Sequence, residues 1–310
     1  MTATEVAMSY SQGSTYQRSG YAAYLERVAR VPSRPHWSTI GGSAFHNWAE
    51  SYNLHQHGID VPLPTPAEAL QTAVDEALER TDGLYTEADI RASKSGKGIT
   101  KAAWPNGADR KWIEHHLPIW FESFKRWQNA IPWDLALIRT PDGADDVPAV
   151  EVGFEFMIAP GVRMRGSVDA IYQDRSTGRY ILVDYKAGAR QPSSPQQLAV
   201  YRAALADQHD LSADDGTFFM VRDAVTTPLY DLRKYTPQFL SWFYAGCADR
   251  KEAHDFLPDP DHNPGMCGFT TTFCYFCGGE LADTIWQPWE VEDFSNPPAG
   301  FPFKNGERPW

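Results

Sequence analysis

The sequence lacks any long apolar run and any basic leader followed by an apolar segment. No stretch of the 310 residues approaches the run of about 18 apolar residues that marks a transmembrane helix. The first twenty residues, MTATEVAMSYSQGSTYQRSG, do not have the basic-then-apolar order of a secretory signal. The sequence therefore predicts a protein without membrane contact, located in the cytoplasm.

Positive charge is also scarce. The chain has 28 Lys and Arg against 40 Asp and Glu, a formal net charge of −12. This balance excludes a protein that coats nucleic acid indiscriminately, but it allows a local basic groove. The basic residues gather in segment 91–101 and around Arg163, Arg165 and Lys186. Segment 91–101 is interpreted either as a DNA-backbone contact or as a solvated loop.

Cysteines are few, and all four lie in the last quarter of the chain: Cys247, Cys267, Cys274 and Cys277. In a cytoplasmic protein such grouping favours a metal site over a disulfide framework. The Cys-x2-Cys spacing suits zinc or an iron–sulfur cluster, and His262 is a further candidate ligand. Buried cysteines without metal are the alternative.

Helical periodicity and capping residues dominate the first half. Segment 65–68, TPAE, places Thr at the N-cap, Pro at the first helical position and Glu at the third. Aromatic residues recur every four positions from Trp112 to Phe124, which is typical of core packing, and Pro118 is expected to kink or divide that helix. Ser43, after two glycines, is expected to cap another helix. Helices are predicted over 19–30, 41–55, 65–81 and 108–131.

The pattern changes to strands at about residue 149. Strands are predicted over 149–158, 162–172, 178–186 and 216–222, with helices over 194–208 and 236–254. The fold class is therefore α/β or α+β. The expected organisation is a helical region (1–148), a sheet-containing core (149–255) and a tail rich in Cys and aromatic residues that packs on the core (256–310), together one structural unit.

Two carboxylates are expected to face one another across the hairpin at 162–186. In an antiparallel hairpin, partner positions have a constant sum; a turn centred on Ser176 gives 352, and Asp169 and Asp184 add to 353. Opposite residues lie about 5 Å apart at Cβ, so these carboxylates need a cation between them. Lys186 points to the same face as Asp184. The set suits a hydrolase that uses a hard divalent metal, whereas a solvated surface pair is the alternative.

Four short motifs in order resemble the PD-(D/E)XK nuclease superfamily, in its RecB/Cas4-like exonuclease branch. They are Gly42-Ser43-Ala44-Phe45-His46, Gly166-Ser167-Val168-Asp169, Asp184-Tyr185-Lys186 and Gln197-x-x-x-Tyr201. The resemblance covers roughly residues 9–60 and 150–280, and it implies a restriction-endonuclease-like core with a mixed central sheet flanked by helices. A phage or mobile-element origin would fit this resemblance, although the sequence does not itself show one.

The resemblance also implies roles for individual residues. Side chains of His46, Asp169 and Asp184 and the backbone carbonyl of Tyr185 would ligate the metal, Lys186 would be catalytic, and Glu155, Gln197 and Tyr201 would be auxiliary. Alternatives remain for some of them. Gln197 is also explained by a capping box with Ser194, Tyr201 by core packing, and His46 by an exposed helix pair with Glu50.

The expected function is a Mg²⁺- or Mn²⁺-dependent exonuclease acting on DNA single strands or ends, in recombination, replication or repair, with proteins of those processes as partners. The alternatives are a non-catalytic DNA-binding module, a structure-specific endonuclease and an RNA nuclease. Relatives of the Cas4-like type often carry a [4Fe–4S] cluster with one cysteine near the N-terminus. This chain has no cysteine before Cys247, so a cluster would need Cys247 in that place, and zinc competes with it.

Overall fold

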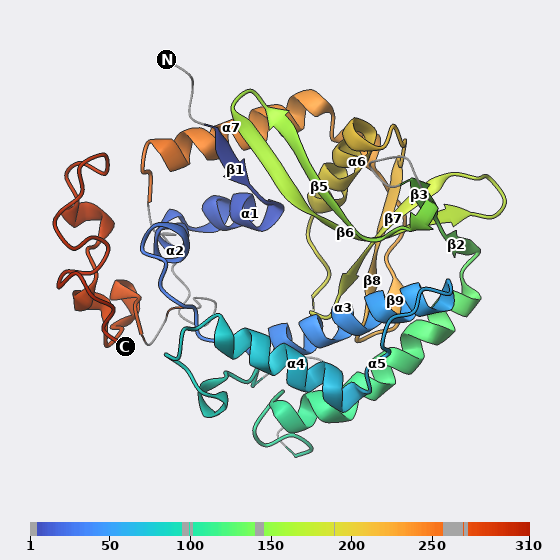
Figure 1. The fold of residues 1–310 in the computed structure, drawn as a ribbon, viewed down its shortest axis with the longest axis horizontal. Coiled ribbons are helices and arrows are strands. Elements are labelled where there is room, and N and C mark those ends of the chain that lie inside the picture. Colours follow the sequence, from blue (N-terminus) through green and yellow to red (C-terminus); the bar gives the residue numbers. More distant parts are fainter. Residues whose placement is uncertain are drawn as a thin grey trace.

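The long strands of the second half form the centre of a mixed sheet (Figure 1). The computed structural model describes residues 5–94, 99, 102–139, 146–188, 190–256, 269 and 272–310. Strand β5 (Val150–Ala159) pairs antiparallel with β6 (Val162–Asp174), and β6 pairs antiparallel with β7 (Tyr180–Lys186). Strand β8 (Asp215–Met220) lies parallel to β7. The four predicted strands are confirmed, as is the mixed α/β class.

Short strands extend this sheet and were not predicted. Strand β1 (Val6–Met8) is parallel to β6, and β2 (Trp133–Leu135) is antiparallel to it. Strands β9 (Val225–Thr226) and β10 (Tyr230–Asp231) pair with β8. Strands β3 (Leu137–Arg139) and β4 (Asp146–Pro148) form a separate two-stranded sheet. Two or three residues carry too little alternation to be recognised in a sequence.

Helices α3 (Trp37–Gln56), α4 (Pro66–Glu79) and α5 (Arg110–Ala130) cover one face of the sheet (Figure 1). The capping box of α4 is present as predicted, with Thr65 and Glu68 bonding each other's backbone. The aromatic stripe of α5 is buried against the sheet. The expected division at Pro118 is wrong, because α5 continues through this residue while its buried stripe holds both halves on the sheet.

Helix α3 begins four residues earlier than predicted. Its N-cap is His36, not Ser43, and Gly41 and Gly42 lie inside the helix. The physical reason is packing between helices. A Cβ on Gly41 would lie 2.7 Å from Cδ1 of Ile113 on α5, so glycine permits a closer approach than any other residue.

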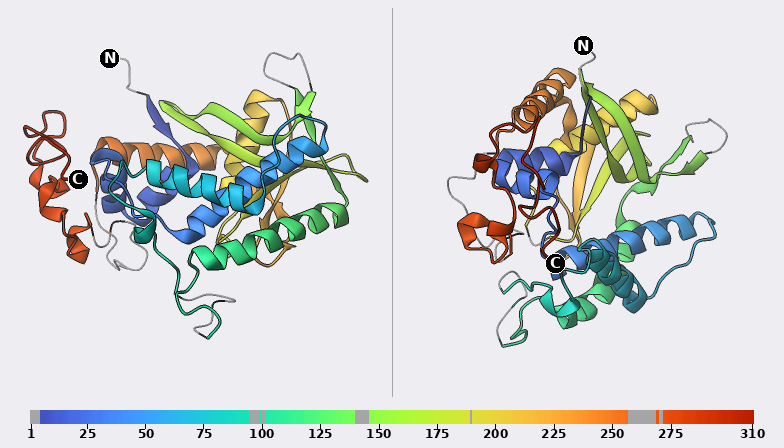
Figure 2. Two further views of the ribbon diagram at one scale, coloured as in Figure 1. Left: turned by 60° about the horizontal axis from the view of Figure 1, so that its bottom comes forward. Right: turned by 60° about the vertical axis from the view of Figure 1, so that its left-hand side comes forward.

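Helices α6 (Gln196–Gln208) and α7 (Pro237–Glu252) cover the opposite face, which completes a three-layer arrangement (Figure 2). Helix α1 (Tyr10–Arg18) packs against α7 and β6. Its Tyr16 joins α2 (Gly20–Ala23), a π-helical turn (Tyr24–Val28) and the C-terminal residues in a third apolar cluster. Single 3₁₀ turns lie at Glu87–Asp89, Leu232–Lys234, Tyr275–Cys277, Ala282–Thr284 and Pro288–Glu290. Within the described residues, no helix has the length and apolar character needed to cross a bilayer.

Candidate active site

Strands β6 and β7 separate at the residues predicted to face one another. Their pairing ends at Ala170 and Val183, whose positions add to 353, so Asp169 and Asp184 are the next pair outward. Beyond this pair, the Tyr185 backbone N–H donates a hydrogen bond to Oδ2 of the Asp169 side chain at 2.7 Å, in place of a backbone carbonyl. Both aspartates are buried. Burial and the neighbouring Asp184 charge raise the pKa of Asp169.

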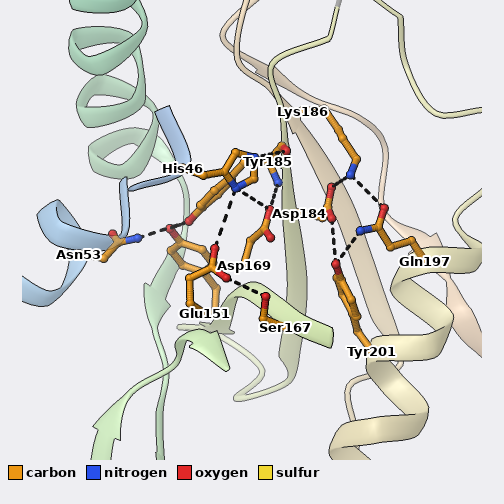
Figure 3. Close-up of polar contacts among 11 residues, drawn as sticks. His46, Asn53, Glu151, Ser167, Asp169, Asp184, Tyr185, Lys186, Gln197 and Tyr201 are labelled. Atoms are coloured by element: carbon orange, nitrogen blue, oxygen red, sulfur yellow. Dashed lines mark hydrogen bonds and ion pairs between the residues drawn. The ribbon is translucent and has the colours of Figure 1, made fainter. Parts of the chain in front are cut away.

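His46 reaches this point from α3, as Figure 3 shows. Its Nε2 donates a hydrogen bond to the Tyr185 carbonyl at 2.9 Å, and its Nδ1 lies 3.5 Å from Asp169 Oδ2. Burial by itself would lower the pKa of His46, but the charges of Asp169 and Glu151 outweigh it and raise the pKa to about 9. Without metal, His46 is therefore an imidazolium at neutral pH and balances part of the negative charge.

Glu151, which was not predicted, is the acidic side chain that β5 contributes here. Its Oε1 lies 3.9 Å from His46 Nδ1, and its Oε2 accepts a hydrogen bond from Ser167 Oγ at 2.8 Å. The backbone of Glu151 has a φ of 46°, in the left-handed region that side chains rarely adopt. This conformation interrupts the regular pairing of β5 beside Asp169.

Glu155 was the acidic residue expected from this strand, and the structure places it elsewhere. Its carboxylate pairs with Arg163 Nη1 at 2.6 Å and is half exposed. Arg163 also pairs with Glu5. This arginine was one of the basic residues expected near the site, but its charge is already neutralised by two carboxylates. Arg165 is exposed. Lys97 and Lys101 of the basic segment lie outside the described residues.

The donor atoms of His46, Glu151 and Asp169 fit a divalent cation. One ligand atom from each residue lies within 4.8 Å of the others. Two ligands on one ion at roughly 2.0–2.6 Å are at most about 5 Å apart, so small side-chain movements bring the three onto one ion. Carboxylate oxygens suit Mg²⁺ and Mn²⁺, and an imidazole nitrogen suits divalent transition metals. Among the described residues, this is the one such group of His, Cys, Asp or Glu side chains.

Asp184 and Lys186 form a second group directly beside the first (Figure 3). Lys186 Nζ lies 2.6 Å from Asp184 Oδ2 and donates to Gln197 Oε1 at 2.9 Å. Gln197 Nε2 donates to the Tyr201 hydroxyl at 2.6 Å, and that hydroxyl donates to Asp184 Oδ1 at 3.2 Å. The four side chains thus close a ring in which each holds its neighbour.

This ring overturns the capping-box explanation of Gln197. Helix α6 begins at Gln196, and the Ser194 hydroxyl accepts from the Gln196 backbone N–H, while the Gln197 side chain points to Lys186. Tyr201 is buried, as core packing also predicted, but its hydroxyl is directed at Asp184. The glycine at position 166 is explained by steric crowding, because a Cβ there would lie 2.8 Å from Cζ of the Phe154 ring.

The cysteines are divided between two apolar clusters. Cys247, on α7, is buried with the residues under α6 and α7, whereas Cys274 and Cys277 pack in the cluster of the tail. Cys267 and His262 lie outside the described residues. The four-cysteine metal site therefore stays a prediction.

Comparison with known proteins identifies relatives and a family. Two phage proteins are similar along most of their length. The Gene 69 protein of Mycobacterium phage L5 is 27% identical over 293 residues, covering 84% of this chain and 92% of the phage protein. The Gene 69 protein of Mycobacterium phage D29 is 28% identical over 272 residues, covering 84% and 93%. The family model of the PD-(D/E)XK nuclease superfamily matches residues 7–278, so the chain belongs to that superfamily.

Proposed function

We propose that the protein is a divalent-metal-dependent DNA exonuclease that hydrolyses phosphodiester bonds. The observation that carries the proposal is the adjacency of the His46, Glu151 and Asp169 donors to the buried Asp184–Lys186 pair, with Tyr185 joining the two groups through its backbone. Membership of a nuclease superfamily supports the same chemistry.

The metal is proposed to be Mg²⁺ or Mn²⁺. His46, Asp169, Asp184 and the Tyr185 carbonyl are the proposed ligands, and Glu151 joins them because it shares the donor cluster. The cation supplies Lewis-acid charge that polarises the phosphate and lowers the pKa of water. To bind it, His46 must give up its proton, since a protonated imidazole has no lone pair to offer.

Lys186 is the proposed catalytic cation. Burial would lower the pKa of Lys186, but the Asp184 carboxylate outweighs it and raises the pKa. The side chain is thus an ammonium at neutral pH, and it acts by stabilising negative charge on the phosphate and orienting water, not by accepting a proton. Gln197 and Tyr201 keep Lys186 and Asp184 in place.

The proposed substrate is DNA, as single strands or at its ends. The proposed role is in phage recombination, replication or repair within the host cytoplasm. Similarity to proteins of two mycobacteriophages supports a phage role. Proteins of these same processes are the proposed partners. A structural [4Fe–4S] or zinc centre on Cys247, Cys267, Cys274 and Cys277 is a separate proposal; absorbance near ~400 nm in fresh protein identifies the cluster, and metal analysis identifies zinc.

The test uses end-labelled linear DNA, covalently closed circles and RNA of one sequence, with Mg²⁺, Mn²⁺ or EDTA. We expect progressive shortening of linear DNA with metal and none with EDTA. Lys186→Met and Asp184→Asn should cut about 10²–10³-fold more slowly, while Glu155→Gln, which alters a carboxylate of β5 outside the site, should cut normally. Cleavage of circles would replace the exonuclease by an endonuclease, and preference for RNA would replace the substrate. Intact substrates throughout would leave a non-catalytic binding module.

A further inference from the structure

A polar network with three buried members and a partly exposed Gln128 lies on the face of the sheet covered by α3 and α5. Gln128 Nε2 donates to Asn53 Oδ1 at 2.6 Å and to the Tyr172 hydroxyl at 2.8 Å. Asn53 Nδ2 donates to the Tyr185 hydroxyl at 3.4 Å, and the two tyrosine hydroxyls are 3.2 Å apart. These four residues, Asn53, Gln128, Tyr172 and Tyr185, are called the amide–tyrosine network below.

The network joins four elements inside an otherwise apolar layer. Asn53 belongs to α3, Gln128 to α5, Tyr172 to β6 and Tyr185 to β7. Asn53 is 1% exposed and both tyrosines are 2% exposed. The surrounding contacts are mostly between aromatic rings, including those of Phe45, Phe124 and Trp127. Apolar contacts hold layers together without fixing their register, whereas a satisfied buried polar network has one geometry.

Tyr185 connects this network to the candidate metal ligands. Its backbone carbonyl accepts from His46 and its backbone N–H donates to Asp169, while its hydroxyl enters the network. On the helix side, Asn53 follows His46 by seven residues, which is two turns, so both project from the same side of α3. The network therefore ties together the helix and the strand that carry the ligands.

We propose that the amide–tyrosine network positions His46 against the Tyr185 carbonyl and Asp169, and so sets the affinity of the site for its divalent cation. Its members are positioning residues that act through α3 and β7. The proposal rests on the proposed metal-dependent function. Outer partners of metal ligands contribute about 10–100-fold in affinity where they have been altered in other proteins.

The test compares Tyr185→Phe and Asn53→Leu with Tyr24→Phe. Tyr24 is the matched control because it is fully buried and its hydroxyl donates to a backbone carbonyl, that of Trp286, in the apolar cluster of the tail. Mn²⁺ affinity is measured by titration calorimetry, and the melting temperature of each variant is recorded. We expect Mn²⁺ binding about tenfold weaker in both network variants and unchanged in the control.

A second readout needs no metal. The ¹⁵N shifts of the His46 ring in the metal-free protein report its hydrogen bond to the Tyr185 carbonyl, and we expect them to change in the network variants but not in Tyr24→Phe. Wild-type Mn²⁺ affinity and wild-type His46 shifts in Tyr185→Phe would overturn the positioning role. If Asn53→Leu does not fold, Gln128→Met tests the same network. Wild-type protein that binds Mn²⁺ without cutting nucleic acid would refute the nuclease function but leave the positioning result intact.

Discussion

Lys186 Nζ lies 2.6 Å from Oδ2 of Asp184, whose side chain is 1% exposed. A carboxylate this deeply buried is expensive unless a cation accompanies it, and within the described structure Oδ2 accepts no hydrogen bond apart from this ion pair. Lys186 is in turn held in its charged form, because the carboxylate raises its pKa against the effect of burial. The same pair thus bears on both the stability of the fold and the proposed catalysis.

Removing the lysine should therefore damage both properties. Lys186→Met leaves the Asp184 carboxylate without its cation, and we expect the free energy of unfolding to fall by about 3 kcal/mol. Cleavage should fall by about 10²–10³-fold, the usual effect of removing one charge-stabilising donor. Urea unfolding and a labelled-DNA assay measure the two effects.

The double variant Asp184→Asn with Lys186→Met separates them. It removes both charges, so most of the lost stability should return while cleavage stays as low as in Lys186→Met. A Lys186→Met protein as stable as the wild type would contradict the importance of the ion pair, and an active double variant would contradict the catalytic role.

Stability of the metal-free protein should fall as pH rises. The pKa of His46 is about 9 in the folded state against 6.5 for an ordinary histidine, so the folded state binds this proton more tightly than the unfolded state. The proton stabilises the fold by up to about 3 kcal/mol. This stabilisation is complete below pH 6.5 and is lost as the pH rises through about 9. Burial and Asp184 raise the pKa of Asp169, which adds a loss of the same sign.

Mn²⁺ binding should show the opposite trend. The metal displaces the same protons, so its affinity should rise between pH 6.5 and about 9. Melting temperatures with and without Mn²⁺ across this range measure both trends, and His46→Gln is the control in which the dependence should flatten. Metal binding that weakens with pH would contradict a site in which His46 is a ligand.

Register arithmetic explains much of what could be predicted from the sequence. Positions paired across β6 and β7 add to 353, so Asp169 and Asp184 could be brought together from the turn alone. The same arithmetic on the turn between β5 and β6 gives 320, which places Glu151 opposite Asp169. This signal was present for Glu151, but the alternation of the strand gave no sign of its left-handed backbone.

Contacts between distant segments could not be predicted in this way. The N-terminal helices and the tail form one apolar cluster, with Tyr21 donating to Gln287 at 2.8 Å. No local period encodes a contact across more than 200 residues. Likewise, the sequence allowed two roles for the Gln197 side chain, an auxiliary role at the site and a helix cap, and only the packing of α6 on β7 decides between them.

The two glycines of α3 should respond oppositely to alanine. A Cβ on Gly42 would meet only the Ala187 Cβ at an ordinary 3.5 Å, so Gly42→Ala should raise the free energy of unfolding by up to about 1 kcal/mol through helix propensity. Gly41→Ala forces the buried Ile113 to move, and a loss of roughly 1–3 kcal/mol is expected. Urea unfolding of both variants measures this, and equal effects would show that Ile113 adapts without cost.

Two glutamates on one strand test the geometry of the metal site most directly. Glu151 lies beside His46 and is held by Ser167, whereas Glu155, four residues further along β5, is paired with Arg163 at the surface. Glu151→Gln keeps the size of the side chain but removes its charge, so Mn²⁺ should bind at least about tenfold more weakly. Glu155→Gln should bind Mn²⁺ as the wild type does, because the Glu155 carboxylate is paired with Arg163.

Removing the Glu151 charge also removes one cause of the raised pKa of His46. This pKa should therefore fall from about 9, and NMR titration of the His46 ring measures the change. If Glu155→Gln weakened Mn²⁺ binding while Glu151→Gln did not, the acidic residue of this strand would be Glu155 after all.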